Sequence, residues 1–153
     1  MRPAGQKRRA FTLFELVVVI MILGILAAIA VPRMLDTSQQ ATENTARQSL
    51  GVIRTAIDHY AAEHKGKWPG ADGQETTLKS DLVNYLRGTD FPKCPIGEAK
   101  NSAVRMLAGS GSIASSIGAT ASTQSWVYQY ETGDLHINST ANAEDGVTTY
   151  DQF

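Results

Sequence analysis

The chain has 153 residues, with 14 basic and 15 acidic side chains and a net charge of −1. A chain of this length supports one small domain, and its balanced charge excludes the basic composition typical of nucleic-acid-binding proteins, so no nucleic acid partner is expected. Cys94 is the sole cysteine, which excludes an intrachain disulfide.

Residues 1–10 form a short basic segment in front of a long apolar run. Four of these residues are cationic and none is acidic: Arg2, Lys7, Arg8 and Arg9. Positive charge beside a membrane span favours retention of that end in the cytoplasm. The pattern therefore predicts a cytoplasmic leader over residues 1–10 and export of everything that follows the apolar run.

Residues 11–31 form the apolar run, which a single acid, Glu15, interrupts. As a helix with a rise of about 1.5 Å per residue, this segment is about 32 Å long and crosses a hydrocarbon core of about 30 Å. We predict a transmembrane helix over residues 11–32. A carboxylate at the centre of such a helix costs about 2.5 to 3.5 kcal/mol and less near its edge, so Glu15 indicates a function.

This N-terminal region resembles the type IV pilin-like family, which includes type IV pilins and the pseudopilins of type II secretion systems. The matching features are the basic leader, Phe11-Thr12-Leu13-Phe14-Glu15, the apolar run and Pro32 at its end. The resemblance implies that a prepilin peptidase cuts between Ala10 and Phe11 and that the new terminus on Phe11 is N-methylated. Ala10 departs from the family pattern, which usually has Gly before the cut.

The resemblance also implies a use for Glu15. Cleavage would create an ammonium on Phe11, and in a staggered helical filament Glu15 of an incoming subunit can meet Phe11 of its neighbour. Glu15 is therefore expected to set the register of assembly. The implied partners are copies of this chain, other pseudopilins, the membrane lipid and an inner-membrane assembly platform.

Two other interpretations of the N-terminus stay open. An ordinary secretory signal peptide fits the small-x-small pattern Ala28-Ile29-Ala30, although Glu15 interrupts its apolar region and Pro32 follows closely after the cut. The second alternative is a membrane anchor with a single span that is not cleaved. The mature N-terminus separates the three, as methylated Phe11, Val31 or an intact leader.

Residues 33–65 are predicted to continue the helix beyond a kink at Pro32, which cannot donate the backbone hydrogen bond of an ordinary helical residue. An apolar stripe with spacings of three and four residues supports this continuation. The stripe consists of Ala46, Leu50, Ile53, Ile57 and Tyr60. Gly66 and Pro69 follow as a stop signal.

Residues 66–153 are predicted to form a globular head. Leucines four residues apart indicate a short helix over residues 77–87, and the prolines of residues 91–97 indicate an ordered crossing segment. The small uncharged side chains of residues 108–123 indicate a flexible loop.

Alternation of aromatic and polar residues gives the clearest β signal. Residues 125–130 place Trp126, Tyr128 and Tyr130 on one face, a turn follows, and residues 135–138 return as the second strand of a hairpin. Two strands alone are marginal, so the hairpin needs the amphipathic helix behind it. The expected fold class is α+β and pilin-like, with one long N-terminal helix packed against a small antiparallel β-sheet.

No catalytic constellation is recognisable, and His59, His64 and His136 are interpreted as surface or packing residues. No cofactor is expected, with calcium as the exception to consider. The acidic tail supplies Asp145 and Asp151 as candidate oxygen ligands near a Gly turn, and major pseudopilins bind Ca²⁺ in a C-terminal loop. Their spacing matches no standard calcium loop.

The sequence as a whole predicts a non-enzymatic filament subunit, namely a pseudopilin of a type II secretion system. The absence of a disulfide, which many type IV pilins carry in a C-terminal loop, favours this over the alternative of a type IV pilin for adhesion, motility or DNA uptake. A membrane-anchored sensor or binding module is a third possibility. The expected location is the bacterial inner membrane, with a single span, a cytoplasmic leader and a periplasmic head.

Overall fold

The computed structural model describes residues 11–88, 90–118 and 123–153, apart from the side chains of residues 31–36, 114 and 115. The predicted leader, including Ala10, lies outside the described residues. The chain divides into two compact units, Met1–Ser38 and Gln39–Phe153. The second unit contains the folded head, and each unit is described separately below.

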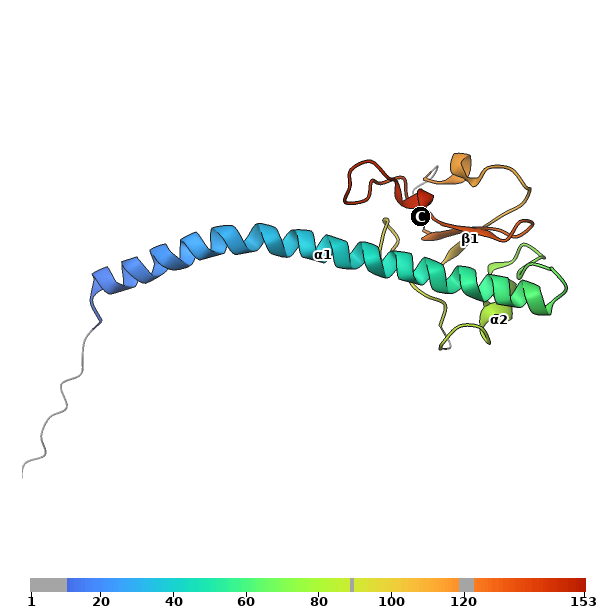
Figure 1. The fold of residues 1–153 in the computed structure, drawn as a ribbon, viewed down its shortest axis with the longest axis horizontal. Helices are drawn as coiled ribbons and strands as arrows, with labels where there is room; N and C mark the ends of the chain where they lie inside the picture. The colour runs from blue at the N-terminus through green and yellow to red at the C-terminus, as the bar shows by residue number, and fades with distance from the viewer. Residues whose placement is uncertain (1–10, 89, 119–122) are drawn as a thin grey trace, which may run out of the picture. The chain divides into compact units, whose positions relative to one another are not determined.

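The long helix expected at the N-terminus is present as α1, which covers Leu13–Glu63 and has 51 residues (Figure 1). The helical backbone continues through Pro32, and the kink expected there stays a prediction. The segment Leu13–Ala30 is long and apolar enough to cross a membrane by length and composition. Because it lies near the N-terminus, a signal sequence would satisfy the same criteria, and the mature N-terminus has to separate the two.

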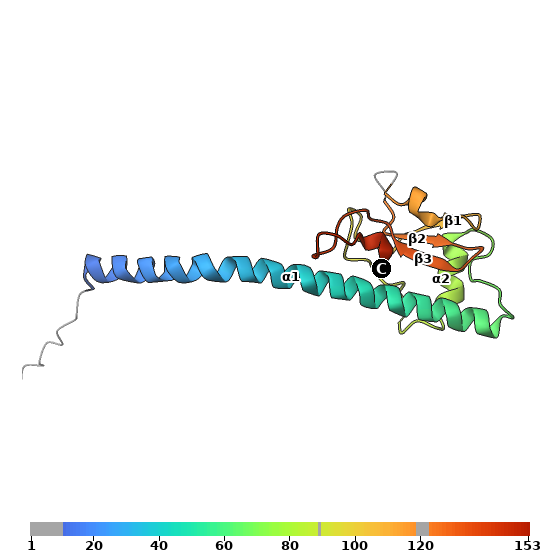
Figure 2. The same cartoon turned by 45° about the horizontal axis from the view of Figure 1, so that its top comes forward.

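The head unit combines the remaining part of α1 with a short helix and a small sheet. Helix α2 covers Glu75–Leu82, and the strands are β1 (Val104–Leu107), β2 (Trp126–Gln129) and β3 (Asp134–Ile137). Two 3₁₀ turns complete the described elements, η1 over Ile113–Ser116 and η2 over Tyr150–Gln152. Figure 2 shows the three strands lying along α1, with α2 beside them.

The sheet has the order β1-β2-β3 and is mixed. The predicted hairpin is present, since β2 and β3 pair antiparallel with Trp126 opposite Ile137. Strand β1 was not foreseen and pairs parallel to β2, with Val104 opposite Trp126. The α+β class is confirmed, while the sheet contains one parallel pair in addition to the antiparallel pair.

Helix α2 is shorter than predicted and starts earlier. The N–H groups of Tyr85 and Leu86 both donate to the carbonyl of Leu82, at 3.0 and 3.1 Å, which closes a turn instead of continuing the helix. Leu78 and Leu82 are fully buried and Leu86 is nearly so, which explains their regular spacing. The leucine pattern therefore reports burial of this segment correctly and its helical length incorrectly.

The main core forms where the apolar stripe of α1 meets one face of the sheet. The predicted stripe is confirmed, because its first four members are at most 2% exposed and Tyr60 packs against them partly buried. The aromatic face of the hairpin is also confirmed, since Trp126 and Tyr128 are fully buried and Tyr130 packs against the same cluster. Burial of a large apolar or aromatic side chain contributes about 1.5 to 3 kcal/mol, so this contact stabilises the head.

The opposite face of the sheet is covered by the segment that was predicted to be a flexible loop. Ile113, the first residue of η1, and Ile117, directly after it, bury against Val127, with Leu107 packed beside them. Arg105 fixes η1 to β1, because its Nη1 donates to the carbonyl of Ser116 at 2.8 Å. The loop prediction is therefore wrong for residues 113–117, where two isoleucines in a Ser- and Gly-rich context suffice to form a second small core. Residues 119–122 of that segment lie outside the described residues.

The proline-containing segment of residues 91–97 is ordered, as expected. Trp126 donates its indole N–H to the carbonyl of Pro92 at 3.0 Å, and the N–H of Cys94 donates to Asn101 at 3.0 Å. Cys94 is fully buried, and this burial raises the pKa of its thiol. The side chain is therefore a packing residue of the core.

Candidate functional site

The first turn of α1 is closed by a reciprocal pair of hydrogen bonds between Thr12 and Glu15. The N–H and the hydroxyl of Thr12 each donate to Glu15 Oε2 at 2.9 Å, and the N–H of Glu15 donates to the Thr12 hydroxyl at 3.2 Å. This is the capping box, in which a Thr before the helix and a Glu three residues later satisfy each other's backbone groups. Glu15, which the sequence indicated as an assembly residue, thus also helps to cap the first turn of α1 together with Thr12.

The capping box uses one oxygen of the Glu15 carboxylate. Both donors from Thr12 reach Oε2, and within the described residues no hydrogen bond or ion pair reaches Oε1. The carboxylate is exposed in this unit. It is therefore held in one orientation by its own helix and keeps an acceptor that a second cation or donor can reach.

Glu15 lies at one end of an exposed apolar surface. Large apolar side chains from Phe11 to Ile29 expose from 37% to 81% of their area, and no part of the segment Leu13–Ala30 is buried. Monomeric soluble proteins rarely expose a contiguous apolar patch of this extent. This surface requires lipid or another protein to cover it.

The predicted processing residues lie at the border of the described region. Phe11 precedes α1 and is 74% exposed, while Ala10 lies outside the described residues. Cleavage between them and methylation of Phe11 stay predictions. The structure places Phe11 four residues before Glu15, so both groups belong to the same end of α1.

The two calcium candidates occupy different roles in the C-terminal segment. Asp145 caps a turn, because its carboxylate accepts from the N–H groups of Val147 and Thr148 at 2.9 and 2.8 Å and from the Thr148 hydroxyl at 2.6 Å. These bonds, led by the Thr148 hydroxyl, lower the pKa of Asp145. Asp151 accepts from His136 Nδ1 through its backbone carbonyl at 2.7 Å.

One atom of Asp151 differs from the rest of this segment. Its Oδ1 is buried and has no hydrogen-bond partner among the described residues. The described residues contain no group of three or more His, Cys, Asp or Glu side chains that could hold a metal ion. Calcium binding by Asp145 and Asp151 therefore stays a prediction.

Sequence patterns did not foresee how the C-terminal segment attaches to α1. Glu144 accepts from Gln40 Nε2 at 2.8 Å, and its N–H donates to Glu43 at 3.1 Å. Arg47 lies over the ring of Phe153, and Arg54 donates from Nη1 to the Phe153 carbonyl at 2.7 Å. We call these contacts the C-terminal clasp.

The clasp holds the end of the chain to the helix without a disulfide. Glu43, which connects it to Arg47 by an ion pair of 2.8 Å, has a lowered pKa because Arg47 donates to it and the Glu144 N–H does so as well. Arg54 lies just off the apolar stripe, which is the one sequence signal that could have indicated a buried anchor. Arg54 donates to the backbone carbonyls of Leu135 and Phe153, and only the tertiary structure shows that these are its acceptors.

Comparison with known proteins places these features in context. The family described as the prokaryotic N-terminal methylation motif matches residues 5–31. Type II secretion system core protein G of Pseudomonas aeruginosa is 33% identical over 79 residues, which cover 52% of this chain and 56% of that protein. The protein of the same name from Escherichia coli is 34% identical over 83 residues, or 54% of this chain and 57% of that protein.

Similarity extends to pilins as well. The type IV major alpha-pilin of Moraxella bovis is 37% identical over 75 residues, which cover 49% of this chain and 46% of that protein. The chain thus spans about half the length of the curated relatives it matches. No solved structure matches it. Residues 5–31 of this chain thus match the prokaryotic N-terminal methylation motif, and about half of the chain is similar to core protein G of type II secretion systems and to type IV pilins.

Proposed function

We propose that this chain is a structural subunit of a type II secretion pseudopilus, a periplasmic fibre that aids protein export. One observation carries the proposal: a capped glutamate with a free oxygen stands at the start of an apolar helical surface that no described part of the chain covers. Similarity to core protein G of type II secretion systems supports it. The relatives are named as a secretion-system core protein and as pilins, which supports a non-enzymatic role.

Assembly in this proposal depends on a charge pair that processing creates. Prepilin peptidase cuts between Ala10 and Phe11, and the new terminus on Phe11 carries an ammonium. Glu15 Oε2 is occupied by Thr12, so Oε1 accepts the ammonium of a neighbouring subunit. Pairing offsets the cost of a carboxylate in the hydrocarbon, which at this edge position is below the value of about 2.5 to 3.5 kcal/mol for the centre of a helix, and this offset is gained only in the correct register.

The rest of the apolar helix packs against neighbouring subunits but does little to fix how the subunits are aligned. Lipid tails are as apolar as the side chains of a neighbouring helix, so extraction of the subunit into a fibre exchanges one apolar environment for another. The hydrophobic term is therefore nearly balanced between membrane and fibre. A polar contact such as that of Glu15 can then decide which arrangement forms.

The proposed location follows from the charge of the leader and the length of the apolar segment. Arg8 and Arg9 directly precede the span, which favours a cytoplasmic N-terminus and a periplasmic head. The proposed partners are prepilin peptidase, an inner-membrane assembly platform, other pseudopilins and further copies of this chain.

A type IV pilin for adhesion, motility or DNA uptake is the second candidate, because the similarity to type IV pilins covers about half of the chain. Deletion of the gene separates the two. A pseudopilus subunit is required for secretion of folded proteins, whereas loss of motility, adhesion or DNA uptake with normal secretion assigns the chain to a type IV pilus.

Mass spectrometry of the N-terminal peptide from membranes tests the processing step. In the normal strain we expect a peptide that begins at N-methylated Phe11. In a strain without prepilin peptidase the leader should remain on the chain, so no peptide should begin at Phe11. A terminus at Val31 would instead identify a secretory signal peptide. An intact leader in the normal strain would identify an uncleaved anchor.

A further inference from the structure

The head carries a hydrogen-bonded loop, which we call the C-terminal tip and which comprises residues 142–149. Asn142 and Thr149 form an isolated antiparallel bridge at its base, and the N–H of Ala143 donates to Thr148 at 2.7 Å. Asp145 caps the turn from inside. Val147 stands at the turn with 84% of its area exposed, which is the highest value among the large apolar side chains described in the head.

The tip lies at one end of the head portion of α1. Its Glu144 contacts Gln40 and Glu43, near the first residues of the unit. In Figures 1 and 2 the same segment is the dark red loop beside that end of the helix. The tip is therefore an ordered projection with an apolar point and acidic flanks, Glu144 and Asp145.

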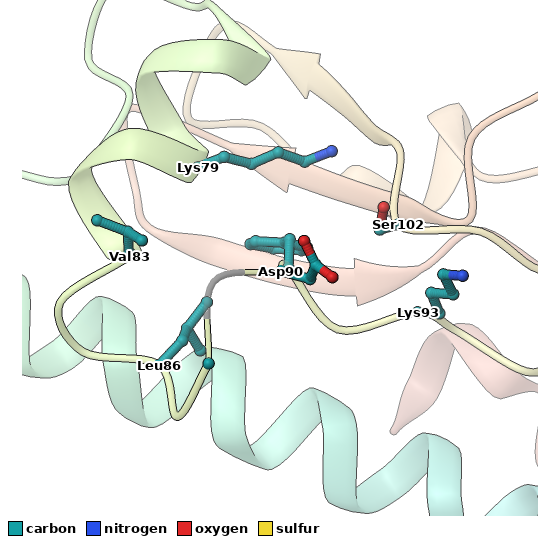
Figure 3. A pocket seen from close by; sticks show the side chains of 8 residues that line it. Lys79, Val83, Leu86, Asp90, Lys93 and Ser102 are labelled. Carbon is teal, nitrogen blue, oxygen red and sulfur yellow. The ribbon is translucent and has the colours of Figure 1, made fainter.

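A cavity of about 360 Å³ lies between α2 and the segment that follows it (Figure 3). Its apolar lining comes from Val83, Leu86 and Phe91. The turn after α2 is tied to the last residue of α1, because the Tyr85 hydroxyl donates to Glu63 at 2.5 Å. At about 1.5 Å per residue, Gln40 and Glu63 are about 35 Å apart along α1, so the tip and the turn after α2 contact opposite ends of the head portion of this helix.

The polar rim of the cavity holds two lysines and one aspartate. Lys79 is already paired with Glu75 at 2.6 Å, whereas Lys93 has no ion-pair partner among the described residues. Figure 3 shows Asp90 between Lys79 on one side and Lys93 and Ser102 on the other. Lys93 is exposed, so its ammonium is available to an incoming acid, while Asp90 opposes one.

We propose that the C-terminal tip of one copy docks into this cavity of the next copy. Val147 contacts the apolar lining, and the acidic flanks of the tip face Lys93. The tip of a chain is bonded to its own α1 at Gln40 and Glu43, whereas the turn beside the cavity contacts α1 at Glu63, so the cavity is assigned to the tip of another copy. A heterologous contact between such surfaces, repeated from copy to copy, produces an open helical assembly. The inference rests on the proposed function as a fibre subunit and adds the contact between heads.

Cysteine cross-linking of the full chain tests the contact directly. Val83 is 39% exposed, and Val147 is 84% exposed, so both accept cysteine without loss of core packing. Native Cys94 is fully buried and stays in place. Under mild oxidation of assembled fibres, the variant with both Val83→Cys and Val147→Cys should give a ladder of cross-linked multimers.

The matched control replaces the cavity cysteine with one elsewhere on the head. Val52 is 44% exposed on α1, and Val52→Cys combined with Val147→Cys should give at least tenfold fewer multimers. Equal yields from the two pairs, or no ladder in fibres that are present, would overturn the docking contact. Failure of the unsubstituted chain to form any fibre would instead refute the proposed function.

Charge substitutions give an independent test with a defined sign. Lys93→Glu should lower the fibre yield and the cross-linking several-fold, whereas Asp90→Asn should raise the cross-linking because it removes the opposing charge. Val147→Lys alone should also reduce fibres. Unchanged fibres with Lys93→Glu or with Val147→Lys, or a loss of cross-linking with Asp90→Asn, would contradict the docking geometry.

Discussion

Arg47 places the centre of its guanidinium 3.4 Å from the centroid of the Phe153 ring while it forms an ion pair of 2.8 Å with Glu43. A cation over an aromatic face contributes about 0.5 to 1 kcal/mol at an exposed site. The ring also meets Tyr150 edge to face, with centroids 5.4 Å apart. The last residue described in the chain is thus a structural part of the head and is attached to α1.

Replacement of Arg54 by Met should destabilise the head by about 1.5 to 3 kcal/mol. Arg54 donates to the carbonyl of Leu135 through Nε and Nη2, at 3.2 and 2.8 Å, and to Phe153 through Nη1, so its loss leaves two partly buried acceptors without donors. Urea unfolding of the full chain in detergent micelles measures the change. Gln48→Met, at an exposed position of the same helix, is the control, and equal effects of the two substitutions would argue against the anchor.

Gly133→Ala should destabilise the hairpin by about 1 to 3 kcal/mol. Gly133 has a φ of +81°, and a Cβ there would overlap the indole ring of Trp68. Gly111→Ala is the control, because nothing lies within 4 Å of its Cβ position. In a Trp68→Ala background the loss should shrink to the backbone strain alone. An unchanged loss in that background, measured by thermal unfolding, would assign the whole effect to backbone conformation.

The stability of the head should fall in acid partly through Asp145. Hydrogen bonds from Thr148 and Val147 hold its pKa below the ordinary value, so the folded state binds its proton less readily than the unfolded state. The stabilisation is present above the unfolded pKa of about 4 and is lost as the pH falls through the lower folded pKa. Asp145→Asn should therefore flatten the decline of melting temperature below about pH 4. An identical decline in Asp145→Asn and the unsubstituted chain would refute this assignment.

Glu15→Ala and Glu15→Leu should insert into the membrane normally and fail to enter fibres, because both variants keep the apolar span and lose the carboxylate. Membrane fractionation measures insertion, and recovery of sheared fibres measures assembly. Thr12→Ser is the matched control, since it keeps the hydroxyl that donates to Glu15 and should assemble. Normal fibres from either Glu15 variant would remove the proposed register contact.

Calcium should raise the melting temperature of the chain if Asp145 and Asp151 hold it, with Asp151 Oδ1 as the buried oxygen without a partner among the described residues. The measurement compares added CaCl₂ with a chelator, using MgCl₂ as the control for ionic strength. Asp151→Asn should abolish the difference. Equal melting temperatures with calcium and with chelator would exclude the site.

Local patterns were sufficient for the elements that a single segment specifies. The three- and four-residue spacing of Ala46, Leu50, Ile53 and Ile57 predicted one buried face of α1, because helical periodicity places those side chains together whatever lies opposite. Alternation around Trp126 and Tyr128 predicted β2 in the same way. The capping box of Thr12 and Glu15 was not predicted, and the structure revealed it by placing both donors of Thr12 on one carboxylate oxygen.

The sequence by itself determined the apolar span, the position of Glu15 at its edge, the buried stripe of α1 and the hairpin, because each depends on the order of neighbouring residues. Tertiary structure alone decided the parallel pairing of β1 with β2, the packing of η1 on the second face of the sheet and the C-terminal clasp. These contacts join segments that are distant in the chain, and their backbone acceptors carry no residue-specific signal. The position of Glu15 can thus be recognised in the sequence, whereas the tip and the cavity of the head are formed by the tertiary structure.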